Sequence, residues 1–172
     1  MKIDYSLTEE DYLAFNLFHA KNSKAVSKSL MLQRFLSPIV FITAAFTFSW
    51  IGDLSLTASL IGFSFISILW IVYYPKYFYY LLTKNSKKML KEGKNDGLLG
   101  DRYMTLSKEG IIDVSSSGET KAHWSGIKSI QEDDSRFYLY NSALSAYIIP
   151  KKSLQNVEET RDYLKKGANH SK

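Results

Sequence analysis

Hydrophobic and polar residues follow three distinct patterns along this 172-residue chain. Residues 2–7 alternate between apolar and polar positions, which is typical of a half-buried strand. Two long runs without a charged residue follow. From residue 102 onward, alternation with period two returns in short segments separated by turn residues. This order predicts a strand, an apolar helical region and then a small β-rich domain.

The two uncharged runs, residues 35–51 and 54–74, predict two membrane-spanning helices. At 1.5 Å per residue they reach about 26 Å and about 31 Å, which matches a hydrocarbon core of about 30 Å. Only Gly52 and Asp53 separate them, so we expect a transmembrane helical hairpin with Asp53 at its tip, in water. Two buried helices of a soluble protein are the alternative, but such helices normally carry a polar stripe, and only hydroxyl side chains interrupt these runs.

Lysine and arginine are frequent on both flanks of the hairpin and absent from its tip, which predicts that both termini face the cytoplasm. Trp50 is expected at the outer membrane interface. The inner interface is expected to hold Trp70, Tyr73, Tyr74 and Tyr77. The basic residues expected to contact anionic lipid headgroups are Lys28, Arg34, Lys76, Lys84, Lys87 and Lys88. This topology explains most of the net charge of +5, so no nucleic-acid partner is implied.

Small side chains predict how the two helices pack, because they let helices approach closely in lipid. The expected packing residues are Ala44 and Thr47 on the first helix, and Ser55, Ala58, Ser59 and Gly62 on the second. Pro38 is expected in the first turn of its helix, where a missing N–H costs little. Two helices alone bury little surface, so we also expect either self-association into a homo-oligomer or a membrane partner.

The flanking segments predict one cytoplasmic α+β domain built from both ends of the chain. We expect an antiparallel meander of about five strands with a closing C-terminal helix, capped by Asn156. The N-terminal strand is expected to join this sheet, and the helix opened by Thr8 and Asp11 to run to about Ser29. The predicted divisions are a strand and helix at 1–29, the hairpin at 30–75, a basic juxtamembrane helix at 76–95 and the domain at 101–168.

Candidate catalytic chemistry is sparse. The chain has no cysteine, and its histidines, His19, His123 and His170, share no metal-ligand spacing. A triad of His123, Ser125 and Asp133 can be written down, but no G-x-S-x-G motif accompanies it. The acidic residues 132–134 fall in a predicted hairpin turn, where Asp is common for its own reasons. We therefore expect no catalytic residue, no metal site and no cofactor.

Four segments carry a resemblance to a known family: "YSLTEEDYLAFNLFHA", "DRYMTLSKEGI", "HWSGIKSIQEDDSRFYLY" and "AYIIPKKSL". Together they resemble the YcxB-like family of small bacterial membrane proteins. The resemblance implies a soluble part similar to bacterial pleckstrin-homology-like domains, and hence a binding role. It brings no catalytic residues. Trp124 is expected to be a core anchor of the sheet, the alternative being a platform for a ligand.

The sequence therefore favours a non-enzymatic, multi-pass protein of the bacterial cytoplasmic (inner) membrane, whose cytoplasmic domain is an interaction module. The expected partners are anionic lipid headgroups and a protein of unknown identity. One alternative, from size and topology, is a membrane immunity protein that neutralises a bacterial toxin. A second is a membrane-surface enzyme, which would have to use His123 or the 132–134 cluster.

Overall fold

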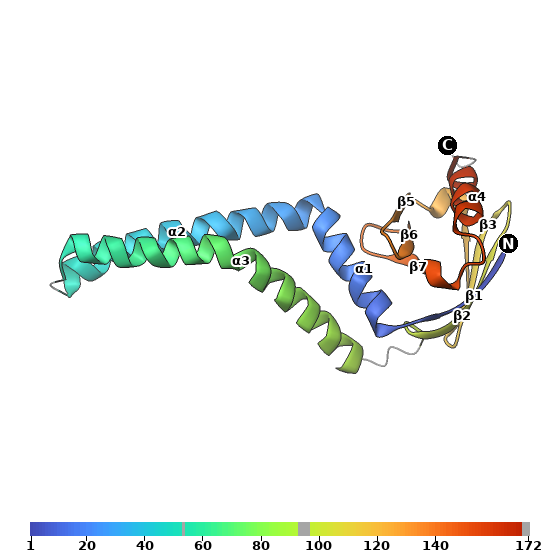
Figure 1. Cartoon of the computed structure of the whole chain (residues 1–172), viewed down its shortest axis with the longest axis horizontal. Helices are drawn as coiled ribbons and strands as arrows, with labels where there is room; N and C mark the ends of the chain where they lie inside the picture. The colour runs from blue at the N-terminus through green and yellow to red at the C-terminus, as the bar shows by residue number, and fades with distance from the viewer. Residues whose placement is uncertain (53, 93–96, 170–172) are drawn as a thin grey trace. The chain divides into compact units, whose positions relative to one another are not determined.

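The computed structural model describes residues 1–52, 54–92 and 97–169. The chain divides into two compact units: an α+β unit, Met1–Phe18 with Ser86–Lys172, and a helical unit, His19–Asn85. Figure 1 shows the elements of both units in chain order. The predicted hairpin tip at Asp53 and the histidine at position 170 lie outside the described residues.

The helical unit contains the end of α1 (Glu9–Asn22), all described residues of α2 (Lys24–Ile51) and most of α3 (Leu56–Glu92). By length and composition, α2 and α3 can each cross a membrane, with 18-residue windows of mean hydropathy 1.5 and 2.0. Only 6% and 11% of these windows is buried within the structure. This low burial differs from that of a core helix in a soluble protein, and the two long apolar helices predicted from the sequence are thus confirmed.

The helix boundaries differ from the predicted ones in two places. The first helix ends at Asn22 instead of Ser29, because Ser23 caps a new helix by accepting a hydrogen bond from the Val26 N–H. Since α2 begins at Lys24, Pro38 lies in the helix interior and the first-turn prediction is wrong. After the second apolar run the chain continues helically, as predicted: α3 runs without a break to Glu92, with Pro75 inside it.

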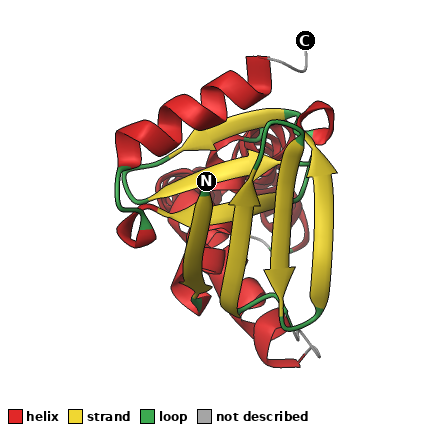
Figure 2. Cartoon of the chain, turned by 90° about the vertical axis from the view of Figure 1, so that its right-hand side faces the viewer, coloured by secondary structure: helices red, strands yellow, loops and turns green. Residues whose placement is uncertain are grey.

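Among the described residues of the α+β unit, seven antiparallel strands form two sheets (Figure 2). The four-stranded sheet has the order β1-β2-β3-β4 and the three-stranded sheet the order β5-β6-β7. The strands are β1 (Lys2–Leu7), β2 (Gly100–Leu106), β3 (Gly110–Ser115), β4 (Gly118–His123), β5 (Ser129–Glu132), β6 (Arg136–Tyr140) and β7 (Ala146–Pro150). A single meander of about five strands was therefore too simple. The sequence "ETKAHWSGIKSI", residues 119–130, has the pattern of one β-rich run, but a 3₁₀ turn at Trp124–Gly126 divides it between β4 and β5, which belong to different sheets.

The N-terminal strand joins the domain, as the sequence predicted. β1 pairs antiparallel with β2 from Lys2↔Thr105 to Leu7↔Gly100. Alternate residues of β1 are buried, so Ile3, Tyr5 and Leu7 enter the core, as period-two alternation requires. The N-terminal amine also donates a hydrogen bond to the Leu106 carbonyl over 2.8 Å.

The core lies between the two sheets and is closed by α4 (Val157–Asn169). Trp124 is only 4% exposed, and its indole N–H donates to the Ser107 carbonyl at 3.0 Å. A Cβ placed on Gly167 of α4 would lie 2.5 Å from the indole. The closing helix therefore rests directly on the tryptophan, and only glycine fits at this contact.

We predict that Trp124→Ala destabilises the α+β unit by about 3–5 kcal/mol, because it removes a buried aromatic anchor and leaves a cavity under α4. Denaturant unfolding of the purified full-length protein in detergent measures this. The matched control is Trp50→Ala, since Trp50 is 86% exposed and should affect the unfolding midpoint little. Equal midpoints for the two variants would contradict the anchor role.

Candidate binding groove between β5 and α4

The sheets offer four edge strands, and their surroundings differ. β1 and β7 contact each other across the two sheets. β4 carries the exposed ion pair of Glu119 and Lys121, whose charged side chains are typical of a protected edge. β5 pairs only with β6 among the described strands and carries no lysine. Because an edge strand presents unpaired backbone groups, β5 is the edge best suited to receive another chain.

An apolar groove of about 290 Å³ lies beside this edge. Figure 2 shows α4 running alongside the three-stranded sheet. The apolar lining comes from the strands and from the inner face of α4 and consists of Ile130, Phe137, Leu164 and Ala168. The polar lining is Gln131, Glu132, Arg161 and Lys165. The groove thus combines an edge strand with an apolar floor and a charged rim.

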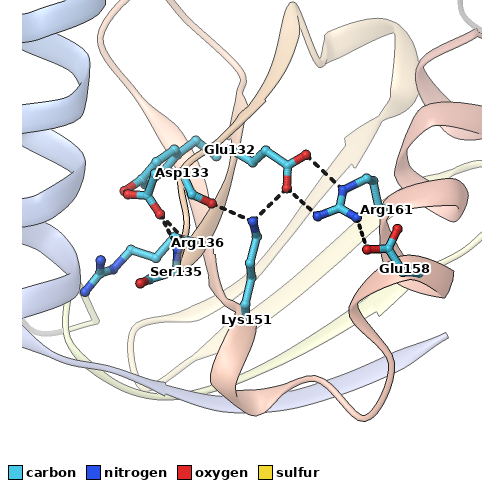
Figure 3. A network of polar contacts seen from close by, with 8 residues as sticks. Glu132, Asp133, Ser135, Arg136, Lys151, Glu158 and Arg161 are labelled. Atoms are coloured by element: carbon cyan, nitrogen blue, oxygen red, sulfur yellow. Dashed lines mark hydrogen bonds and ion pairs between the residues drawn. The ribbon is translucent and has the colours of Figure 1, made fainter.

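A network around Glu132 ties β5 to α4 (Figure 3). The Glu132 carboxylate accepts from Nζ of Lys151 at 2.7 Å and from Nε and Nη2 of Arg161 at 2.9 Å each. Arg161 also pairs with Glu158 on its own helix. Both cations lie over the Phe137 ring, at 4.8 Å and 5.6 Å from its centroid. The network therefore holds α4 at a set distance from β5 and shapes the groove.

Asp133, next to Glu132, has a structural role in the β5–β6 turn. One carboxylate oxygen accepts the backbone N–H groups of Ser135 and Arg136 at 2.8 Å and 2.7 Å. The other accepts the Tyr138 hydroxyl at 2.6 Å. Across the described part of the chain, no group of three or more His, Cys, Asp or Glu could hold a metal ion. Nor does a hydrogen bond among the described residues join Asp133 to His123 or Ser125.

The same turn is anchored to α1 by an ion pair that joins residues 125 positions apart. Nε of Arg136 donates to Asp11 at 2.8 Å, and their side chains are 13% and 2% exposed. Asp11 also closes the predicted capping box, since it accepts from the Thr8 hydroxyl at 2.7 Å and the Thr8 N–H at 3.1 Å. Burial alone would raise the pKa of Asp11, but the hydrogen bonds from Thr8 and Arg136 outweigh it and lower the pKa.

A second cavity, of about 190 Å³, lies between α1, β1, β2 and the start of β7. Its lining is mixed and includes Tyr12, Phe15, Asn16, Arg102 and Tyr147. Arg102 donates to the buried carboxylate of Asp113, whose pKa is raised by burial despite this neighbour. Arg102, the one charged residue among the described residues of this lining, already pairs with Asp113. The two edge strands that border the cavity, β1 and β7, contact each other, whereas β5 has no such neighbouring edge among the described strands.

The predicted membrane-interface residues fall into two groups in the structure: some are exposed, and others contact α2. Trp50, Tyr73 and Tyr77 are exposed, as expected of side chains facing lipid or headgroups. Trp70 and Tyr74 face α2 instead: the Trp70 indole donates to the Gln33 carbonyl at 3.3 Å, and the Tyr74 hydroxyl bonds the Gln33 side chain. The two rings stack with centroids 4.6 Å apart.

The predicted lipid-contact residues also form two groups, those that are exposed without a named partner and those that bond another protein residue. Lys28, Lys76 and Lys84 are exposed. Lys87 pairs with Glu9 at 3.6 Å, and Lys88 with Glu92 at 3.5 Å. Arg34 is half-buried, and its Nε donates to the Ile71 carbonyl of α3 at 2.8 Å. Sequence reasoning missed this bond, although a proline four residues after Ile71 was a signal for it.

Only some of the predicted packing residues are buried or half-buried in the structure. Ser59 is buried and Ala44 half-buried, whereas the exposed ones are Thr47, Ser55, Ala58 and Gly62. Ala45, Ser67 and Tyr74 are buried in addition. The buried positions Ser59 and Ser67 are eight residues apart on α3, which puts them on one face of that helix.

We predict a pH-dependent stability contribution from Glu132. Its hydrogen bonds to Arg161 and Lys151 lower its pKa to about 2, below the usual value near 4.3. Because this pKa is lower in the folded than in the unfolded protein, ionised Glu132 stabilises the fold at pH values above its unfolded-state pKa. This contribution is lost as the pH falls toward about 2. Because the carboxylate is partly exposed, Glu132→Gln should cost at most about 1 kcal/mol at neutral pH.

Urea unfolding midpoints of the full-length protein in detergent, compared between neutral and acidic pH, measure this contribution. The midpoint difference between wild type and Glu132→Gln should shrink as the pH falls. Glu119→Gln is the matched control, because Glu119 lies on β4 and forms its ion pair with the exposed Lys121 rather than with α4. A difference that stays constant down to the acid end would show that Glu132 does not act through its charge.

The comparison with known proteins finds a family match over part of the α+β unit. Residues 106–166 match the family model described as YcxB-like protein. This segment begins at the last residue of β2 and contains β3–β7 and most of α4, including the residues of the Glu132 network. No curated protein and no solved structure matches the chain. The two long apolar helices and this match fit a membrane protein. Residues 106–166, which hold the larger part of the α+β unit, are therefore YcxB-like, as the sequence resemblance indicated.

Proposed function

We propose that this protein is a non-enzymatic, membrane-anchored binding protein whose α+β unit receives an extended segment of a protein partner in the groove between β5 and α4. The observation that carries the proposal is the combination of the β5 edge with an apolar groove at its side. An extended peptide can add to such an edge through main-chain hydrogen bonds, while a groove beside it selects the side chains. The pleckstrin-homology-like character implied by the resemblance agrees with a binding role.

The membrane anchoring is supported by the exposed apolar surface of α2 and α3. β1 precedes both helices and β2 follows them, yet the two strands pair. Two helices that cross a bilayer once each return the chain to its starting side, so this pairing is compatible with a transmembrane hairpin. The basic flanks support a cytoplasmic side for both termini, and the YcxB-like match supports the bacterial inner membrane.

Anchoring would also help weak recognition. A binding unit held at a membrane meets membrane-bound partners at a raised effective concentration. The exposed Lys28, Lys76 and Lys84 would add attraction to anionic headgroups, at about 1 kcal/mol each near the surface. Self-association through the exposed small residues of α2 and α3 would multiply such contacts further.

Site-specific photocrosslinking in intact cells tests the proposal. A photoreactive residue at Gln131, which is exposed on β5 at the groove, should give a discrete crosslinked species. The matched control is the same residue at Lys121, exposed on the other free edge strand, β4. The control should give none, because charged side chains protect that edge.

A second variant ties the crosslink to the groove. Ile130→Lys places a charge in the apolar lining, and it should abolish the crosslink from position 131 while the thermal midpoint shows that the protein stays folded. Crosslinks of equal yield from positions 121 and 131, or a crosslink unaffected by Ile130→Lys, would refute the groove as the binding site. If the crosslinked species is a toxin encoded beside this protein, the immunity alternative gains its first support.

A further inference from the structure

Pro75 interrupts the backbone hydrogen bonding of α3 at a defined carbonyl. Proline has no N–H, so the carbonyl four residues earlier in the helix, that of Ile71, receives no normal helical bond from position 75. Figure 1 shows that α3 is not straight, and proline is a recognised cause of such bends. In an apolar surrounding, a carbonyl without a donor costs several kcal/mol.

The missing donor is replaced from the neighbouring helix. Nε of Arg34 on α2 donates to this same Ile71 carbonyl at 2.8 Å, across 37 residues of sequence. Arg34 is half-buried, and its guanidinium lies 5.4 Å from the ring centroid of Phe35. The donor therefore comes from a side chain that also packs on its own helix, α2.

Two further hydrogen bonds surround this one. The carbonyl of Gln33 accepts the Trp70 indole N–H at 3.3 Å, and the Gln33 side chain bonds the Tyr74 hydroxyl. Trp70 and Tyr74 stack on one another, and Phe41 meets the edge of Trp70 at 5.8 Å between centroids. Residues 33–34 of α2 and 70–75 of α3 thus form one connected contact at the ends of the two predicted spans.

We propose that Arg34 and Pro75 act together as an interhelical clasp, in which the Arg34 side chain caps the Ile71 carbonyl that Pro75 leaves open and so holds α2 against the bend of α3. The clasp is independent of the proposed binding function. It gives Arg34 a positioning role within the helical unit in place of a headgroup contact through Nε. The bend and the helix contact depend on each other: Pro75 leaves the Ile71 carbonyl without its helical donor, and Arg34 supplies that donor.

A double-mutant cycle tests the coupling, with hydrogen–deuterium exchange of the full-length protein in nanodiscs as the measurement. Arg34→Ala should raise the exchange of amides flanking Pro75 in α3 about 10-fold, because the carbonyl loses its charged donor. In a Pro75→Ala background the new N–H can bond the Ile71 carbonyl, so Arg34→Ala should then change exchange less than about 3-fold.

Lys28→Ala is the matched control, because Lys28 is an exposed base on the same flank of α2 and should leave α3 unchanged in both backgrounds. If Arg34→Ala fails to fold, rescue by the added Pro75→Ala supports the clasp, and failure of that rescue overturns it. Equal effects of Arg34→Ala in both backgrounds would also overturn it. If those equal effects appear only in nanodiscs that contain anionic lipid, Arg34 acts through headgroups instead.

Discussion

The pairing of β1 with β2 is the constraint on which the rest of this structure depends. Six residues at the start of the chain lie against residues 100–105, with the whole helical unit between them in sequence. Closing a loop of this length costs conformational entropy, although the cost grows only slowly with length. It is offset by the burial of Ile3, Tyr5 and Leu7 and by the ladder of hydrogen bonds. The helical unit must therefore begin and end at the same domain.

The domain that results is held at its β5 edge by charges. Glu132, Lys151 and Arg161 connect β5, the turn after β7 and α4, while Arg136 and Asp11 connect the adjacent turn to α1. The first group is partly exposed and contributes little to stability, so its main effect is on geometry. The Asp11–Arg136 pair is buried, and loss of one partner would leave the other charge unpaired in the core. The first set lies at the groove beside β5, and the second fixes the turn that follows β5.

The sequence predicted those parts of the fold that depend on local pattern. Alternation identified β1, the uncharged runs identified α2 and α3, and Thr8 with Asp11 identified the start of α1. It did not predict that the Trp124 turn separates two sheets, because one strand-like run covers both sides of that turn. It also treated Pro38 as a first-turn proline, since the cap at Ser23 was not recognised and the helix was assumed to begin later.

The candidate site was harder to predict than the fold, because its residues meet only in three dimensions. The acidic residues 132–134 were assigned to a hairpin turn, and the structure gives Glu132 two cationic partners and Asp133 a turn to stabilise. Arg161 and Lys151 had no local signal that pointed to Glu132. Likewise Trp70 and Tyr74 belong to an aromatic stretch, and composition alone cannot tell which rings turn toward a neighbouring helix.

The central claim is that both ends of the chain form one domain on the cytoplasmic side of a membrane crossed twice. Cysteine labelling measures this most directly, because the chain has no native cysteine. Single variants Asp4→Cys and Glu159→Cys place thiols at exposed positions of β1 and α4, and Asp53→Cys places one between the two apolar helices. In intact cells a membrane-impermeant maleimide should label only the Asp53→Cys variant, while detergent-permeabilised cells should label all three. Labelling of the Asp4→Cys or Glu159→Cys variant in intact cells would contradict the account.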